Sequence, residues 1–218
     1  ICIAFLLLLL RRNRKQAFLQ KNYDPTTGLY NKSYLDDILG SLIHDLLRAR
    51  YYAVCISANY EALLKYYGKD PAQSLANYIA STLKSETQEG EFGVHADDDI
   101  MFLWLIQAAT QEQAEKRVSD MIEKLNRENG ILNEDYHLAI SAGCYGLSQA
   151  RESGERIHKI TSEAYFYAEE NALNYFFADS NFIKMVDRKA RLQKETVQAV
   201  KKGQILFYLQ YIVDIQSN

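Results

Sequence analysis

Short apolar runs alternate with amphipathic helical segments along this chain, and this alternation constrains the fold more than any other feature of the sequence. Only four residues, three of them aspartates, separate the runs 92–96 and 101–106, a spacing typical of a β-hairpin. Strands interleaved with helices, with one central hairpin, indicate a mixed central β-sheet flanked by helices, an α/β (α+β) fold. The predicted strands are Tyr51–Ala58, Phe92–Ala96, Met101–Ile106 and His137–Tyr145, with a closing strand that begins at Phe176 and Phe177.

Capping residues and helix breakers predict where the helices begin and end. Ser33 is a good N-cap for the first helix, because its hydroxyl can accept from a free backbone N–H of the first turn. A short helix that carries Leu64 is expected to end at Gly68. Asp70 and Gln73 then have the spacing of a capping box that begins the next helix.

The composition is that of a globular protein with a real core. The 218 residues are 48% hydrophobic and 24% charged, enough for one domain with attachments. The net charge of -3 and the pI of about 5.9 argue against a nucleic-acid-binding protein, which needs a basic surplus to neutralise phosphates. The three cysteines are far apart and form no CxxC pair, which indicates thiols in a reducing compartment.

The N-terminus combines an apolar run with basic residues. Residues 1–10 are all apolar, and three arginines and a lysine follow within residues 11–15. We interpret residues 1–12 as the end of a transmembrane helix and 13–23 as a linker, which places the domain on the cytoplasmic side of the cell membrane. A signal-peptide remnant and a buried helix end are the alternatives.

Most standard catalytic motifs are absent from the sequence. There is no phosphate-binding GxxxxGK[ST] loop, no GxGxxG, no HExxH and no GxSxG, and the four histidines lack metal-ligand spacing. The one unusual polar feature is Asp97-Asp98-Asp99 in the predicted hairpin turn. Carboxylates and substrate phosphates together hold Mg²⁺ in many proteins, so a metal-nucleotide site is chemically plausible. A solvated acidic turn with no role is the alternative.

The segment Asp24-Pro-Thr-Thr-Gly-Leu-Tyr-Asn-Lys32 resembles the DxLTGLxNR motif that opens GGDEF domains, the bacterial family that makes cyclic di-GMP from two GTP. The resemblance covers residues 24–181 and implies a cyclase palm-like fold with a ferredoxin-like core. The matching segments are 56–73 for DxDxFKxxND…GH..GD, Ala96-Asp97-Asp98-Asp99-Ile100 for GGDEF, Ser141-Ala142-Gly143 for SxG, and 164–168 for the ALYxAK helix.

The resemblance also shows where this chain departs from an active cyclase. The two metal-binding carboxylates of the family correspond to Ile56 and Asp98, so Asp98 alone remains as a weak candidate Mg²⁺ ligand, if a nucleotide binds. Ala96 and Asp97 replace the two hairpin glycines that let the backbone approach the phosphates.

The positions that contact the nucleotide are altered as well. The guanine-reading Asn and Asp of the family correspond to Leu64 and Gln73, and the phosphate-contacting Lys corresponds to Glu169, a reversal of charge. Phosphoryl transfer depends on positioning and charge stabilisation, so no intact catalytic site is expected. The product-inhibition motif RxxD is also missing, because residues 87–90 stand in its place.

The C-terminal run Leu209–Asp214 resembles the YQPIVD-like start of an EAL domain, the family that hydrolyses cyclic di-GMP. Residues 182–218 would then be a linker helix and the first strand of a truncated EAL-like domain. A helix and strand that belong to the first domain are the alternative.

Together these resemblances imply a catalytically inactive regulatory domain of cyclic di-GMP signalling that couples a membrane sensor to an EAL-type output. The implied partners are an EAL-type domain in the same chain, a second copy, and GTP or cyclic di-GMP. This segment is not expected to be an enzyme, whereas a longer parent would be a cyclic di-GMP phosphodiesterase. An active cyclase with altered metal and guanine contacts and a ligand-free spacer remain as alternatives.

Overall fold

The computed structural model describes residues 12–13, 16–41, 50–96, 100–127, 139–147 and 152–204. The chain divides into two compact units, residues 1–179 and residues 180–218. The first unit contains the sheet and most of the helices. Of the second unit, residues 180–204 are described, and they contain one long helix.

The first unit is built on a six-stranded mixed sheet, which confirms the predicted fold class. The strand order is β1-β3-β4-β2-β5-β6, parallel at the two outer pairs and antiparallel between the four central strands. The central order β3-β4-β2-β5, with β3 and β4 consecutive along the chain and the other connections made through helices, is that of a ferredoxin-like core. The strands are β1 Tyr30–Asn31, β2 Tyr51–Ala58, β3 Phe92–His95, β4 Phe102–Gln107, β5 Ile140–Gly146 and β6 Tyr175–Phe177.

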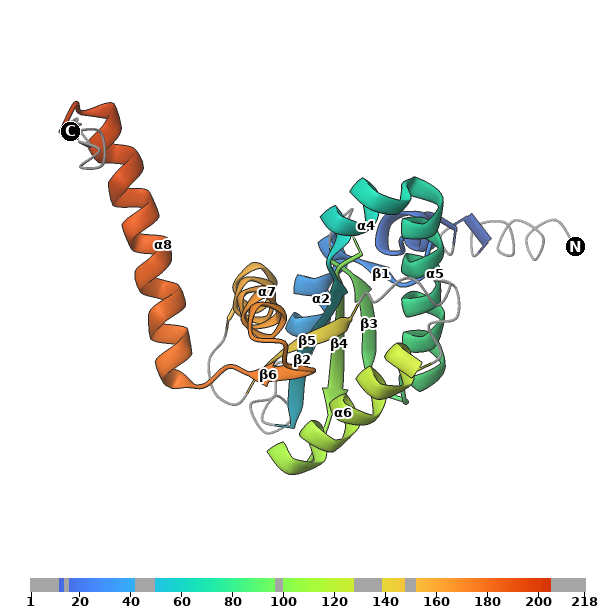
Figure 1. Cartoon of the computed structure of the whole chain (residues 1–218). Helices are drawn as coiled ribbons and strands as arrows, with labels where there is room; N and C mark the ends of the chain where they lie inside the picture. The colour runs from blue at the N-terminus through green and yellow to red at the C-terminus, as the bar shows by residue number, and fades with distance from the viewer. Residues whose placement is uncertain are drawn as a thin grey trace, which may run out of the picture. The chain divides into compact units, whose positions relative to one another are not determined.

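Helices cover both faces of this sheet (Figure 1). Apolar side chains of α5 and α6 pack on one face, and those of α2 and α7 pack on the other. The helices are α2 Leu35–Ser41, preceded by the 3-10 turn Lys32–Tyr34, then α4 Tyr60–Tyr67, α5 Lys69–Glu86, α6 Gln111–Arg127, α7 Gly154–Glu170 and, in the second unit, α8 Ser180–Lys201.

The strand β2 lies at the centre of the core, which explains its unbroken apolar sequence. Val54 and Ile56 belong to the cluster under α5 and α6, whereas Ala53 and Cys55 belong to the cluster under α2 and α7. Successive side chains of a strand point to opposite faces, so a strand covered on both sides must be apolar throughout. This burial fixes the register of β2 relative to both neighbours.

Two of the predicted helix starts are wrong. Asn31, not Ser33, is the N-cap of the 3-10 turn, because its side-chain oxygen accepts from the N–H of Tyr34 at 3.1 Å. The helix α5 begins at Lys69, so Asp70 lies inside the first turn, and Gln73 donates to Asn77 at 3.3 Å instead of capping. The cause is Gly68.

Gly68 is the C-cap of α4, as predicted, and also the N-cap of α5. Its φ of +87° lies in the left-handed region, which only glycine enters without strain. The chain therefore turns from one helix directly into the next, with no residues between them for a capping box.

Several sequence predictions fall on residues outside the described ranges. They are the apolar run 1–10, the acidic turn 97–99, and the EAL-like run 209–214. Within the described part of the chain, no helix combines the length and hydropathy needed to cross a membrane. Residues 16–22 of the predicted linker are helical.

Candidate functional site

The predicted hairpin and the C-terminal end of β2 lie at the same end of the sheet. His95 of β3 pairs with Phe102 of β4, which pairs with Ile56 of β2, which in turn pairs with Ala142 of β5. Paired residues of neighbouring strands point to the same face. Ala96 follows His95 and begins the hairpin. The hairpin therefore lies at the same end of the sheet as Ile56, with β4 between β3 and β2.

Ile56 is completely buried, with 0% of its surface exposed, in the apolar cluster beneath α5 and α6. Its side chain offers no oxygen to a metal ion. Ala96 and Ile100 at the base of the hairpin are also buried, and the N–H of Ala96 donates to the carbonyl of Met101 at 3.0 Å. Asp97, Asp98 and Asp99 lie outside the described residues, so the structure does not place the predicted Mg²⁺ ligand Asp98.

Leu64 and Gln73 lie on two helices that contact each other, α4 and α5. Leu64 is 38% exposed although it is apolar. The side chain of Gln73 is exposed, and its amide donates to Asn77 within the same helix. At these two positions the chain therefore offers one apolar side chain and one neutral amide.

Glu169, near the C-terminal end of α7, interacts with a buried tyrosine of the same helix. The hydroxyl of Tyr165 lies within hydrogen-bonding reach of Glu169 and of Ser57 on β2. Tyr165 is 2% exposed and belongs to the cluster beneath α2 and α7. Burial, followed by the negative charge of Glu169, raises the pKa of Tyr165, so this hydroxyl stays protonated and can donate.

Ile56 and Tyr165 belong to apolar clusters on opposite faces of the sheet. Ser57, the neighbour of Ile56 in the strand, points to the face of Tyr165, as strand geometry requires. The structure therefore does not bring Ile56 together with the group formed by Tyr165, Glu169 and Ser57. This group was not predicted from the sequence, although Tyr165 and Glu169 have the i, i+4 spacing of helix neighbours.

The N-terminal motif contacts the strand that leads into the hairpin. Asp24 Oδ1 accepts from the N–H and the hydroxyl of Thr27, both at 2.6 Å, and lies 3.4 Å from His95 Nδ1. Burial raises the pKa of the Asp24 carboxyl, but the hydrogen bonds from Thr27 and the interaction with His95 outweigh burial, so the pKa is lowered. This contact was also not predicted, because it depends on the parallel pairing of β1 with β3.

Among the described residues, no group of three or more His, Cys, Asp or Glu side chains could hold a metal ion. Several buried polar groups in the described core instead bind to protein partners. Glu91, for example, pairs through both carboxylate oxygens with Arg117 and accepts from the N–H groups of Gln88 and Gln107.

A family model described as "Diguanylate cyclase, GGDEF domain" matches residues 21–174. This chain belongs to the GGDEF family. The match includes the end of the sheet where Ile56 and Ala96 lie, and it covers most of the first unit. No curated protein sequence matches the chain.

Solved GGDEF structures have the same fold. The coiled coil and GGDEF domain of DgcB from Caulobacter crescentus in complex with c-di-GMP aligns at a TM-score of 0.64 and 13% identity, over 80% of this chain and 95% of that one. A diguanylate cyclase/phosphodiesterase from Caldicellulosiruptor saccharolyticus aligns at 0.59 and 21% identity, over 74% and 94%. LapD S helix-GGDEF-EAL from Vibrio cholerae, bound to c-di-GMP, aligns at 0.62 and 15% identity, over 79% of this chain and 40% of that chain. At these identities, the likeness establishes the fold of this GGDEF domain and not its activity.

Proposed function

We propose that this GGDEF domain is catalytically inactive and acts as a regulatory element in cyclic di-GMP signalling, coupling a membrane sensor to an EAL-type output. The observation that carries the proposal is the packing of Ile56. A buried isoleucine with no exposed surface occupies the position where the family resemblance requires a metal-binding carboxylate. The residues present do not fit a magnesium site with two carboxylates, since Asp98 is the only one of the pair in the sequence.

The nucleotide-contacting positions support the same proposal. Leu64 cannot hydrogen-bond a base edge, and Gln73 already donates to Asn77. The carboxylate of Glu169 lies near the Tyr165 hydroxyl and would repel a triphosphate. Catalysis of phosphoryl transfer needs preorganised positive charge at the phosphates. The position that the resemblance assigns to the phosphate-contacting lysine carries the carboxylate of Glu169 instead.

The coupling role rests on sequence resemblance and on the relatives. The apolar run 1–10 with its following basic residues supports membrane attachment on the cytoplasmic side. The run 209–214 supports an EAL-type continuation, and LapD is a relative that contains a GGDEF domain followed by an EAL domain. Cyclic di-GMP is bound in the structures of LapD and DgcB, which makes it the first candidate ligand here.

Two other functions compete with this proposal. An active cyclase with altered metal and guanine contacts predicts a product from GTP that depends on Asp98 and the metal. A ligand-free spacer predicts that the domain matters only for the distance it spans. Asp98 and its acidic neighbours favour the first alternative, and no described contact favours the second.

Phosphodiesterase output separates a regulatory domain from a spacer. In a longer protein that carries the EAL-type domain, residues 24–181 would be replaced by an unrelated domain whose two ends have the same separation. We expect the rate of cyclic di-GMP hydrolysis to change, together with its response to the membrane sensor. Unchanged hydrolysis and an unchanged response would show that the domain is a spacer.

A further inference from the structure

The helix α8 carries the strongest local charge of the described chain. Its 22 residues include six Lys or Arg and two Asp or Glu, a net charge of +4. The whole chain carries -3, so the residues outside α8 carry -7. Such an asymmetry indicates that this helix meets an anionic surface.

One face of α8 is apolar and largely exposed. Phe182 and Val186 are buried, but four other apolar side chains on the same half of the helix are about half exposed. These four side chains are Met185, Leu192, Val197 and Val200, with exposed fractions of 50%, 48%, 54% and 58%. The spacings of seven, five and three residues between them keep all four within one half of the helix.

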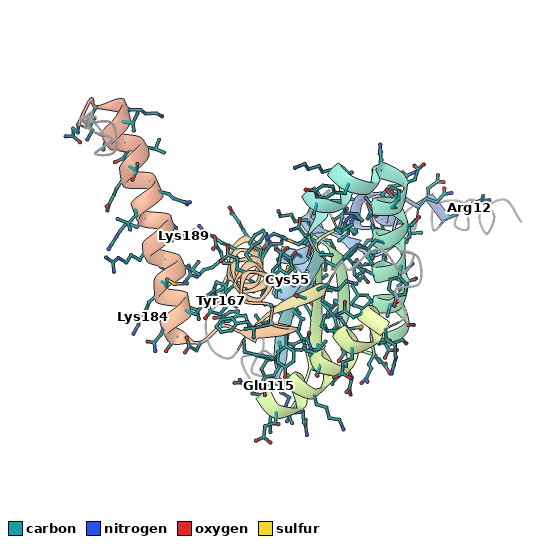
Figure 2. The ribbon with its side chains drawn as sticks, in the orientation of Figure 1. Arg12, Cys55, Glu115, Tyr167, Lys184 and Lys189 are labelled. Atoms are coloured by element: carbon teal, nitrogen blue, oxygen red, sulfur yellow. The ribbon has the colours of Figure 1, made fainter. Side chains whose placement is uncertain are left out.

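The basic side chains lie mostly on the other half of the helix. Arg191 stands nine residues, about two and a half turns, from Val200 and therefore points away from the apolar face. Lys184 falls on the same side, whereas Lys194 lies at the border of the apolar face, three residues before Val197. Lys189 lies within the apolar face, four residues after Met185, where its long stem can reach out to a charged surface. Figure 2 shows Lys184 and Lys189 projecting from α8.

We propose that α8 binds the surface of an anionic membrane, with its exposed apolar face at the boundary between headgroups and acyl chains. Its eight charged side chains exclude a membrane-spanning role. An amphipathic helix with a basic face and a separate apolar face has the chemistry of an interfacial helix, because both faces find partners at a bilayer of anionic lipid. An apolar protein groove would satisfy only one of them. The inference does not depend on the proposed function of the GGDEF domain.

An environment-sensitive fluorophore on single cysteines of the full chain tests the proposal. Cys2→Ser removes the one cysteine not known to be buried, since Cys55 and Cys144 are buried and unreactive. The fluorophore is attached at Thr196→Cys on the apolar face or, as a matched control, at Arg191→Cys on the opposite face. Vesicles of phosphatidylcholine, with or without phosphatidylserine, are then added, and circular dichroism confirms that each variant is folded.

With phosphatidylserine present, we expect a blue shift at position 196, none at position 191, and a weaker shift at high salt. Lys184→Glu with Arg188→Glu should weaken the partitioning measured at position 196 by on the order of a hundredfold. The matched control is Lys69→Glu with Lys116→Glu on α5 and α6, which changes the net charge by the same amount. This variant should leave the partitioning to vesicles unchanged.

Three results would overturn the proposal. One is the absence of a shift at position 196 with phosphatidylserine. Another is a shift that is equal at the two positions or equal without phosphatidylserine. The third is a fluorophore at position 196 that is already blue-shifted before vesicles are added, because a protein segment or a second copy would then cover this face.

Discussion

Tyr165 and Glu169 lie one turn apart on α7, and the buried hydroxyl of the tyrosine lies within hydrogen-bonding reach of the carboxylate. Both residues depart from the ALYxAK pattern, in which leucine and lysine occupy these positions. A buried hydroxyl requires a partner, and Ser57 and Glu169 are both within reach of this one. A lysine at position 169 would remove one of the two, because it cannot accept. We therefore expect the two departures to be coupled.

This coupling predicts a double-mutant result. Glu169→Lys should lower the free energy of unfolding by about 0.5–1.5 kcal/mol, because the buried Tyr165 hydroxyl loses one of its two partners. In a Tyr165→Phe background the same change should cost less, with a coupling of about 0.5–3 kcal/mol. Denaturant unfolding measures both.

The matched control for this cycle is Glu170→Lys, which changes an exposed carboxylate of the same helix by the same charge. It should stay within about 0.5 kcal/mol of the unchanged protein. Equal costs of Glu169→Lys with and without the Tyr165 hydroxyl would contradict the coupling.

Restoring the family carboxylate on β2 should destabilise the domain. Ile56→Asp places a charge in an apolar cluster without a partner and should cost about 3–5 kcal/mol. Ile56→Val keeps the site apolar and should cost only about 0.5–1.5 kcal/mol. We expect that GTP with Mg²⁺ does not recover the loss in thermal unfolding. A nucleotide-dependent rise in Tm of the Asp variant would mean that a metal site can still form.

Gly143, in the segment that resembles the SxG motif, allows α7 to approach β5. A Cβ at this position would lie 2.1 Å from the carbonyl oxygen of Thr161 and 2.1 Å from the backbone nitrogen of Tyr165. Because both are backbone atoms, Gly143→Ala must shift the helix, and it should cost about 3 kcal/mol or more. At Gly146 an added Cβ meets only the ring of Tyr52 at 3.3 Å, so Gly146→Ala should be near neutral. Similar stabilities of the two variants would refute this account of the contact.

The Glu91–Arg117 pair predicts acid sensitivity. Burial raises the pKa of Glu91, but the hydrogen bond from Arg117, those from the N–H groups of Gln88 and Gln107, and the charge of Arg117 outweigh it, so the pKa lies below its ordinary value of 4.5. A lowered carboxyl pKa stabilises the fold above the ordinary value, and this stabilisation disappears as the pH falls through the folded pKa.

We therefore expect the free energy of unfolding to fall as the pH drops below about 4.5. Glu91→Gln should flatten this dependence, whereas Glu89→Gln, at an exposed neighbour, should leave it intact. Parallel pH profiles of the unchanged protein and Glu91→Gln would assign the acid sensitivity to other carboxylates.

The order of strands and helices from α2 to β6 could be predicted from the sequence, because each buried strand is a short apolar run and each helix has one apolar face. The two-residue strand β1 was not predicted, because it has no such run. The exact helix starts could not be predicted, because the left-handed Gly68 joins α4 to α5 and leaves no room for the cap predicted at Asp70. The contact of Asp24 with His95 could not be predicted either, because it requires β1 to lie beside β3.

The candidate site was predicted in part. The identity of Ile56 is readable from the sequence, but its complete burial depends on three paired strands and a covering layer of helices. The role of Glu169 needed the position of the Tyr165 hydroxyl. The spacing of these two departures from one motif could have indicated it, since they face each other across one helical turn.

Product analysis after incubation of the purified chain with GTP and Mg²⁺ or Mn²⁺ tests the central claim most directly, with Asp98→Ala as the matched control. The account predicts that GTP remains unchanged with both proteins, because the second metal carboxylate is replaced by Ile56 and the phosphate-contacting cation by Glu169. Formation of cyclic di-GMP, or of any other product that disappears in Asp98→Ala, would contradict it and show that the altered hairpin still organises a metal-bound nucleotide.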